Sequence, residues 1–287
     1  MRALVLSGGG VKGSYEAGAI RYLMGERGRQ YHVICGISAG ALNAAFLCQY
    51  RVGEEKKASA ALQDLWRGID NSKVWKRWFP FGKLHALWGG SALDSRPLHR
   101  TVRQGLDRDA LVASGRKLRV GSVNLRGDYR VFREDEECIV DAVLASSAVP
   151  ALFIPIEIDE QTWVDGAIRE DTPIKAAIDL GADEVDVIVT SPKGTRLTPI
   201  DDPTGWDVLM RAIDIMADEV MEADIQIALL YNRLLDAGGP APGKRHVKIN
   251  LIRPNKVLVD DLLDFDRKVI ADLQLIGYND ARDQIPI

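Results

Sequence analysis

The 287-residue sequence lacks several features that mark particular classes of protein. It has only three cysteines, an odd number, and Cys35, Cys48 and Cys138 all stand among apolar residues. We therefore expect reduced thiols and a cytoplasmic protein. The N-terminus enters a strand pattern without a signal-peptide region, and no apolar run is long enough to cross a bilayer. Any membrane contact is expected to be peripheral, at the inner face.

The sequence also lacks an excess of positive charge. The chain carries 37 Lys and Arg against 41 Asp and Glu, a net charge of −4, which argues against a nucleic-acid partner. No linker-like or low-complexity segment interrupts it, so we expect residues 1–287 to form a single domain. No constellation with metal-ligand spacing is present, and we predict neither a metal nor a cofactor.

What the chain does contain is a serine presented between a strand and a helix. The segment Gly36-Ile37-Ser38-Ala39-Gly40 follows the apolar residues 31–35 and precedes the helix-like residues 41–47. This G-x-S-x-G pattern is typical of a nucleophile elbow, in which the flanking glycines leave room for a strained turn. The helix that follows directs its N-terminal amides at charge developing on the serine. A plain helix N-cap serine is the alternative.

A glycine-rich loop, residues 7–13, follows the short predicted strand 2–6 and opens a helix over 14–26. It is not a nucleotide-phosphate loop, because Lys12 precedes Gly13 instead of following it. It is not a dinucleotide-binding loop either, because the second strand ends at Cys35 and Gly36 and not in an acidic residue. The amides of Gly9 and Gly10 instead suit an oxyanion hole.

The third motif, Asp165-Gly166-Ala167, follows the apolar pair Trp163 and Val164. Alone, an Asp-Gly pair indicates only a turn. Together with the serine and the glycine loop, it resembles the patatin-like phospholipase family, whose pattern is GGGx(R/K)G, GxSxG and DG(A/G).

The likeness extends over most of the chain, including Ala145 to Phe153 and Leu93 to Leu98. It implies a three-layer α/β/α fold with a mostly parallel central sheet. It also implies Ser38 as nucleophile, Asp165 as base, and an oxyanion-hole loop formed by Gly8, Gly9, Gly10, Lys12 and Gly13. Arginine is frequent where Lys12 stands, and lysine keeps the charge without the planar fork.

The histidines favour a Ser-Asp dyad over a triad. A triad on an α/β-hydrolase scaffold needs a histidine after the acid, and only His246 of the four has that order. It stands at the start of a predicted strand, in a basic flank, and the serine comes too early in the chain for that scaffold. In a dyad the aspartate itself accepts the serine proton, and desolvation must make it a stronger base.

Further strands are expected at 118–123, 129–132, 185–190 and 246–252, with helices over 138–147 and 260–282. A long helix carries apolar residues at spacings of four and three, and we expect this stripe to pack against the body as core. The stripe consists of Leu209, Ile213, Met216, Val220, Ala223, Ile227, Leu230 and Leu234.

Residues 65–95 are rich in aromatic and cationic side chains, and we predict a helical cap or lid there. Its aromatic residues are Trp66, Trp75, Trp78, Phe79, Phe81 and Trp88. Such a cluster suits either transient contact with a membrane surface or an internal aromatic core.

The sequence thus predicts a serine-dependent lipid acyl hydrolase acting on phospholipid or lysophospholipid in lipid metabolism, through an acyl-enzyme intermediate. A triacylglycerol lipase, a thioesterase or an acyltransferase would use the same dyad. A lipid-binding or regulatory module without turnover is the alternative from another class.

Overall fold

The computed structural model describes residues 1–79, 85, 89–194, 199–240 and 242–285, and its centre is an eight-stranded sheet. The strand order is β10-β9-β1-β2-β5-β8-β7, with β6 also paired to β5. The strands are β1 (Arg2–Leu6), β2 (Val33–Gly36), β5 (Lys117–Asn124), β6 (Tyr129–Arg133), β7 (Ile156–Ile158), β8 (Gln161–Asp165), β9 (Glu184–Ile188) and β10 (Lys248–Ile252). The five strands from β10 to β5 run parallel, which confirms the predicted mostly parallel sheet.

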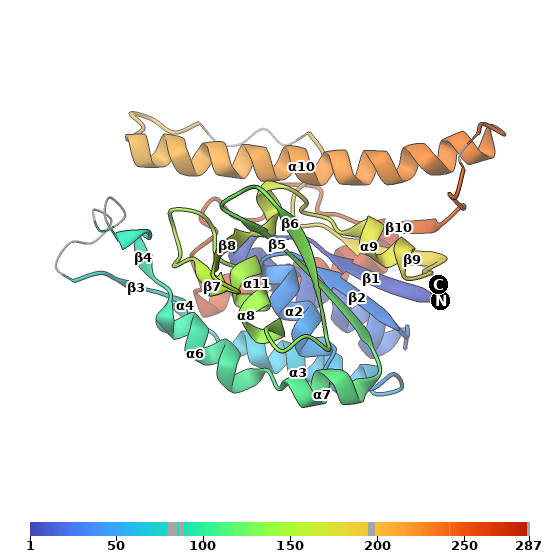
Figure 1. The fold of residues 1–287 in the computed structure, drawn as a ribbon, viewed down its shortest axis with the longest axis horizontal. Coiled ribbons are helices and arrows are strands. Elements are labelled where there is room, and N and C mark those ends of the chain that lie inside the picture. The colour runs from blue at the N-terminus through green and yellow to red at the C-terminus, as the bar shows by residue number, and fades with distance from the viewer. Residues whose placement is uncertain (80–84, 86–88, 195–198, 241, 286–287) are drawn as a thin grey trace.

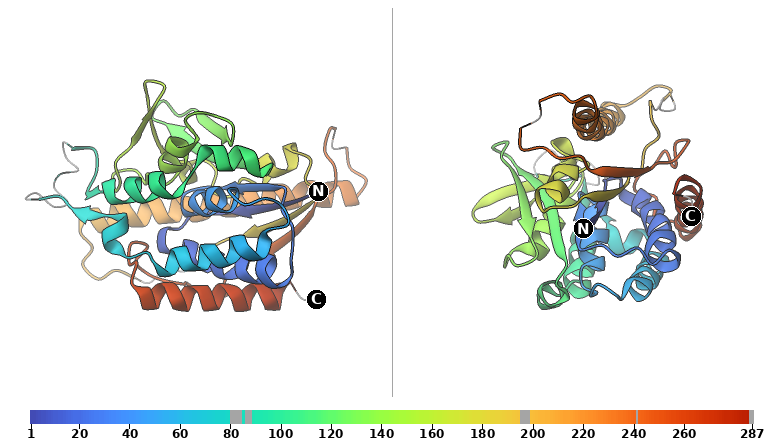
Figure 2. Two further views of the ribbon diagram at one scale, coloured as in Figure 1. Left: turned by 90° about the horizontal axis from the view of Figure 1, so that it is seen from below. Right: turned by 90° about the vertical axis from the view of Figure 1, so that its right-hand side faces the viewer.

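Helices cover both faces of the sheet (Figures 1 and 2). The larger face carries α1 (Gly13–Ile20) with a π-helical extension (Arg21–Glu26), α2 (Ala39–Leu47), α3 (Glu55–Arg67), α6 (Arg96–Gly105), α7 (Arg108–Ser114), α8 (Ile139–Ser146) and α11 (Arg267–Gln284). The opposite face carries α9 (Ile174–Asp179) and α10 (Gly205–Asp236). The three-layer α/β/α architecture expected from the sequence is therefore present.

The two cores follow from strand alternation. Leu4 and Leu6 of β1 belong to the larger core, whereas Ala3 and Val5 belong to the core under α9 and α10. Successive side chains of a strand point to opposite faces, so an unbroken apolar strand needs cover on both sides. None of the described helices combines the length and the apolar character that a bilayer span requires.

The long helix α10 contradicts one prediction. It packs against the body through Met221 and Ile225, which are buried, and not through the predicted stripe. Leu209, Met216 and Leu230 of that stripe are exposed. A periodic pattern identifies an apolar face but not what covers it, and the face that α10 buries also carries polar residues such as Asp224 that obscure its pattern.

The described part of residues 65–95 is helical only in part. It holds the last turn of α3, the single turn α4 (Asn71–Val74) and a two-stranded ribbon of β3 (Lys76–Arg77) and β4 (Leu93–Asp94). Phe81 and Trp88 lie outside the described residues. The aromatic cluster is divided: Trp66 is buried, whereas Phe79 is 95% exposed.

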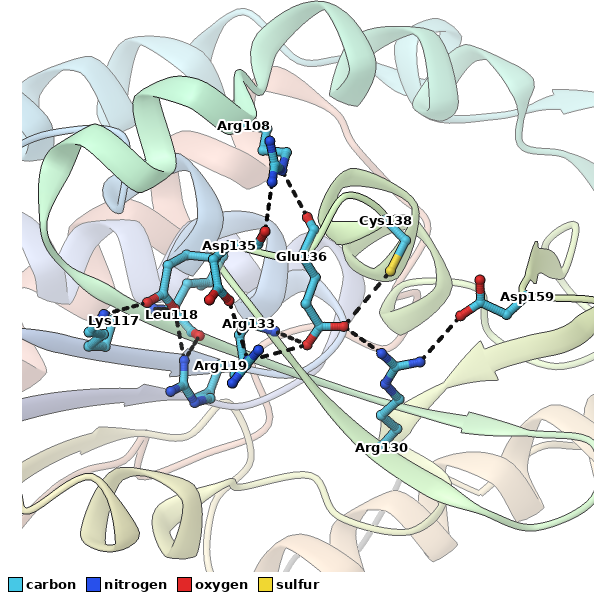
Figure 3. A network of polar contacts seen from close by, with 11 residues as sticks. Arg108, Lys117, Leu118, Arg119, Arg130, Arg133, Asp135, Glu136, Cys138 and Asp159 are labelled. Carbon is cyan, nitrogen blue, oxygen red and sulfur yellow. Dashed lines mark hydrogen bonds and ion pairs between the residues drawn. The ribbon is translucent and has the colours of Figure 1, made fainter.

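A network of ion pairs ties the β5–β6 hairpin to the loop before α8 (Figure 3). Glu136 accepts hydrogen bonds from Arg130 and from the backbone amide of Arg133, while Arg108 of α7 donates to the carbonyls of Asp135 and Glu136. These contacts hold the segment that leads into α8, and the last residue of α8, Ser146, accepts a hydrogen bond from the backbone amide of Ser38.

Candidate active site

Ser38 stands at the sharp turn between β2 and α2. Its backbone has φ 54° and ψ −125°, a conformation that costs a non-glycine residue about 1–3 kcal/mol. The turn is tight on both sides, since a Cβ on Gly36 would lie 2.2 Å from the Gly40 carbonyl and one on Gly40 would lie 2.4 Å from the Ser7 carbonyl. Only glycine fits at these positions. This strained geometry is that of a nucleophile elbow.

The sheet register brings Asp165 level with Ser38. Gly36, the last residue of β2, is paired with Val120 of β5, and Ser38 follows two residues later, while Ser122 follows Val120 by two residues on β5. Ser122 is the partner of Asp165 in the antiparallel pair β5–β8. Strand β8 pairs only with the part of β5 that extends beyond β2, and this places the aspartate beside the serine.

The two side chains form one buried polar pair. Ser38 is 6% exposed and Asp165 is 2% exposed, and the hydroxyl of Ser38 favours the charged form of the Asp165 carboxylate, which lowers its pKa. The Ala167 amide donates to the same carboxylate over 2.9 Å and acts in the same direction. Burial outweighs them and raises the pKa of Asp165 to about 7. A carboxylate with that pKa can exchange a proton with a hydroxyl far better than an ordinary aspartate.

The glycine loop has fewer available amides than the sequence predicts. The Gly8 amide donates to Asp171 over 3.0 Å, the Lys12 amide to the Gly9 carbonyl over 3.0 Å, and the Gly13 amide to the Gly10 and Val11 carbonyls. Within the described residues, the amides of Gly9 and Gly10 meet no acceptor. The loop is held against the end of β9. There Thr190 donates to the Gly8 carbonyl over 2.6 Å, and the Lys12 ammonium lies 3.1 Å from the Ser191 hydroxyl.

Three side chains at the site escaped sequence reasoning. Ser146, at the end of α8, accepts the Ser38 amide over 3.0 Å and so fixes the strained turn. Asp171 accepts the Gly8 amide, and Asp224 of α10 accepts the amides of Asp171 and Thr172 over 3.0 Å each. Burial raises the pKa of Asp171 to about 8, and the charge of Asp165 acts in the same direction. The sequence offers one signal for Asp171, which follows the Asp165-Gly166-Ala167 motif closely. Ser146 lies in the segment from Ala145 to Phe153 that resembles the family, but this resemblance gives the residue no role.

A cavity of about 820 Å³ opens beside this pair. Ser38, Asp165 and the Gly8–Gly10 turn line it, and most of its wall is apolar. The apolar wall includes Leu42, Phe46, Trp66, Trp75, Phe153 and Met210, while charged residues such as Arg77, Asp214, Asp218 and Asp260 also contribute to the lining. The pair thus lies in a pocket with room for a hydrocarbon chain.

Comparison with known proteins places this site in a family. The sequence model of the patatin-like phospholipases matches residues 4–178, more than half of the chain and including Ser38 and Asp165. The chain belongs to the patatin-like phospholipase family.

Relatives of this patatin-like protein are distant and longer. It is 28% identical over 206 residues to the uncharacterized protein YjjU of Escherichia coli (strain K12), covering 69% of this chain and 54% of YjjU. It is 30% identical over 201 residues to a patatin-like phospholipase domain-containing protein of Aspergillus niger, covering 61% of this chain and 26% of the relative. The crystal structure of VipD from Legionella pneumophila aligns with a TM-score of 0.47 at 14% identity, covering 99% of this chain and 66% of VipD.

The histidines of this patatin-like chain lie away from the cavity. No histidine of the described residues lines its wall. His246 precedes β10, the edge strand of the sheet, and so lies at the N-terminal ends of the parallel strands, whereas Ser38 follows the C-terminal end of β2. The His246 Nε2 atom lies 3.6 Å from Asp236 Oδ1. His99 contacts the Ser95 hydroxyl, and burial lowers its pKa. Among the described residues, Asp165, and no histidine, therefore lines the cavity together with the serine.

Proposed function

We propose that this protein is a serine-dependent lipid acyl hydrolase that uses Ser38 and Asp165 as a catalytic dyad. The observation that carries the proposal is a strained, buried serine whose hydroxyl acts on the pKa of a buried aspartate, with both residues in the wall of a mostly apolar cavity. Phospholipid or lysophospholipid is the leading substrate class.

In the first half-reaction, Ser38 Oγ attacks the ester carbonyl carbon while Asp165 takes the hydroxyl proton. The carbonyl electrons move onto oxygen, and the amides of Gly9 and Gly10 donate to that oxyanion, each worth about 3–4 kcal/mol by precedent. The amide of Ala39, at the start of α2, has no partner within the helix and can add a third donor. Gly8, Lys12 and Gly13, the other members of the predicted oxyanion-hole loop, use their amides within the loop or on Asp171 and so shape the hole.

When the tetrahedral intermediate collapses, the bond to the alcohol breaks and Asp165 returns the proton to the departing oxygen. The product is an acyl ester on Ser38. Water then attacks that ester while Asp165 accepts its proton, and collapse releases the fatty acid and restores the Ser38 hydroxyl. Asp165 suits both directions because its pKa of about 7 lies near neutral pH.

The apolar cavity supports an acyl chain as the recognised group. Burying one methylene is worth about 0.8 kcal/mol, so a long chain supplies the binding energy that holds the ester carbonyl at Ser38. Trp66, Val74, Trp75 and Leu93 all line the cavity, which supports residues 65–95 as a cap over the acyl site within a single domain. The exposed Phe79 ring on this segment suits transient contact with a lipid surface.

The test is fatty-acid release from phospholipid, lysophospholipid and triacylglycerol, with Ser38→Ala as the matched variant. We expect release that depends on Ser38 and is greatest for a phospholipid or lysophospholipid. Greater release from triacylglycerol would make the protein a lipase on the same dyad. Lipid binding without release, equal in both proteins, would contradict the enzyme and favour a binding module.

A further inference from the structure

The outer face of α10 is an apolar stripe that the protein itself leaves uncovered. Leu209, Met216, Ala223 and Leu230 are exposed, as are Ile227 and Leu234, and two of the side chains are especially open: Ile227 is 54% and Leu230 62% exposed. Ile213 and Val220 at its margin are half-buried, and Ile213 also lines the cavity beside Ser38, so the seam is clear of the cavity only from Met216 onwards. From Leu209 to Leu234 the stripe spans about 38 Å of helix. Apolar surface of this extent on one element marks an interaction site.

The stripe repeats with the period of a coiled-coil seam. Its members alternate at spacings of four and three residues without a break, which is a heptad with a mean period of 3.5. One set of positions holds Ile213, Val220, Ile227 and Leu234, and the other holds Leu209, Met216, Ala223 and Leu230. A seam with a period of 3.5 residues keeps facing a second helix that supercoils around it. A straight helix packed on a protein body follows a period of 3.6 residues instead.

The stripe is free to meet a partner. Figure 1 shows α10 along the upper side of the molecule, with residues 199–204, which lead into it, arching above its N-terminal end, and the end-on view in Figure 2 shows it projecting from the body. None of the described helices or strands lies over its outer face. The inner face is occupied by Met221 and Ile225. The helix thus has its own attachment to the body and a second, independent apolar face.

The charge of α10 argues against a lipid surface as the occupant. Within Gly205–Asp236 there are seven acidic residues and two basic ones, Arg211 and Arg233, a net charge of −5. Helices that lie in a membrane interface are rich in Lys and Arg on their polar side. A protein helix with the same heptad is the better match.

We propose that α10 pairs with α10 of a second copy of this chain in an antiparallel coiled coil. In the flush antiparallel register, Leu209 lies against the partner's Leu234, Ile213 against the partner's Leu230, and every member of the seam finds a partner. The flanking Glu219 then lies near the partner's Gln226, whose amide can donate to it. A parallel pair would instead direct Glu219 towards position 224 of the partner, where Asp224 is already bound to the amides of Asp171 and Thr172, so Glu219 would find no hydrogen-bond donor there.

Sedimentation velocity of the full chain tests the proposal without any measurement of catalysis. We expect a dimer for the wild type, a monomer for Leu230→Glu, and a dimer for the control Leu275→Glu, which adds the same charge at an exposed leucine of α11. Circular dichroism verifies that each variant is folded. A monomeric wild type overturns the proposal, whether or not it binds phosphatidylcholine vesicles. A dimer that survives Leu230→Glu, or that Leu275→Glu also abolishes, overturns it as well.

Disulfide trapping tests the orientation. An antiparallel pair brings Leu209 of one copy to the partner's Leu234, while the two positions in one chain stand about 38 Å apart. Oxidation should therefore cross-link Leu209→Cys/Leu234→Cys into a dimer, but neither single variant. The wild type, with its three native cysteines, gives the background. Cross-linking of the single variants, or none in the double variant, contradicts the antiparallel register.

Discussion

The edge of the sheet that carries Ser38 and the outer face of α10 both have clear sequence patterns, yet the structure treats them in opposite ways. At the sheet edge, Ser38 and Asp165 are buried and hydrogen-bonded in a strained arrangement. On α10, Leu230 and Ile227 stand exposed without a described partner element. A motif that places polar groups at strand ends specifies its own neighbours, because the backbone fixes them. An apolar stripe specifies only that something must cover it.

The largest effect is expected at the sheet edge. Ser38→Ala and Asp165→Asn should each lower turnover by about 10⁴-fold or more, because the two groups act as a unit. Steady-state hydrolysis of a soluble ester measures this. Near-normal activity of Asp165→Asn in a folded protein would contradict the role of Asp165 as the base of the dyad.

Asp165→Asn should also make the folded protein more stable than the wild type. Burial raises the folded-state pKa of Asp165 to about 7, so the free energy that this group contributes is present in acid and is lost as pH rises towards 7. Asparagine has no such loss. The variant should gain as much as ~4 kcal/mol over the wild type between pH 4 and pH 8, with the gain levelling off above about pH 7. Urea unfolding at several pH values measures the difference; a gap that stays constant with pH contradicts it.

The two faces of α10 should differ in their cost of truncation. Met221→Ala on the inner face should cost about 2–4 kcal/mol, since that side chain is buried. Leu230→Ala on the outer face should cost less than ~0.5 kcal/mol at a dilution where the chain is monomeric. The cost of Leu230→Ala should then grow with protein concentration. Equal costs for the two variants at all concentrations would mean that the outer face is not free.

A smaller effect is expected at Asp171, the carboxylate that links α10 to the glycine loop. Asp171→Asn keeps an oxygen that can accept the Gly8 amide. Burial raises the pKa of Asp171 to about 8, above the pKa of about 7 for Asp165, so Asp171 is mostly protonated where Asp165 ionises. The rise of kcat/KM with pH should therefore move by less than ~0.5 unit in the variant. A larger move to lower pH would show that Asp171 carries its charge while Asp165 titrates, and would contradict this order of ionisation.

His246→Ala should have the smallest effect. Its side chain is exposed and pairs only with Asp236 at 3.6 Å, a contact worth about 0–1 kcal/mol. Activity should stay within about twofold of the wild type, in contrast to the dyad variants. A collapse of turnover with the fold intact would revive a triad.

Much of the sheet edge was predictable because its signals are local. The apolar runs before Leu6 and Gly36 predicted β1 and β2, and their glycines predicted the turns that follow. Asp171 and Ser146 were not predictable, because they act on Gly8 and Ser38 across 163 and 108 residues of sequence. The exposure of Leu230 was unpredictable for another reason, since α10 buries a face of mixed polarity instead of its apolar stripe.

Reaction with a fluorophosphonate tests the central claim most directly, because that probe forms a covalent adduct only with an activated serine. Intact mass measurement should find one adduct on the wild type, mapped to Ser38 by peptide sequencing. Ser38→Ala should carry none, and Asp165→Asn should react far more slowly. A folded wild-type protein that stays unlabelled, or an adduct on another serine, would contradict the account.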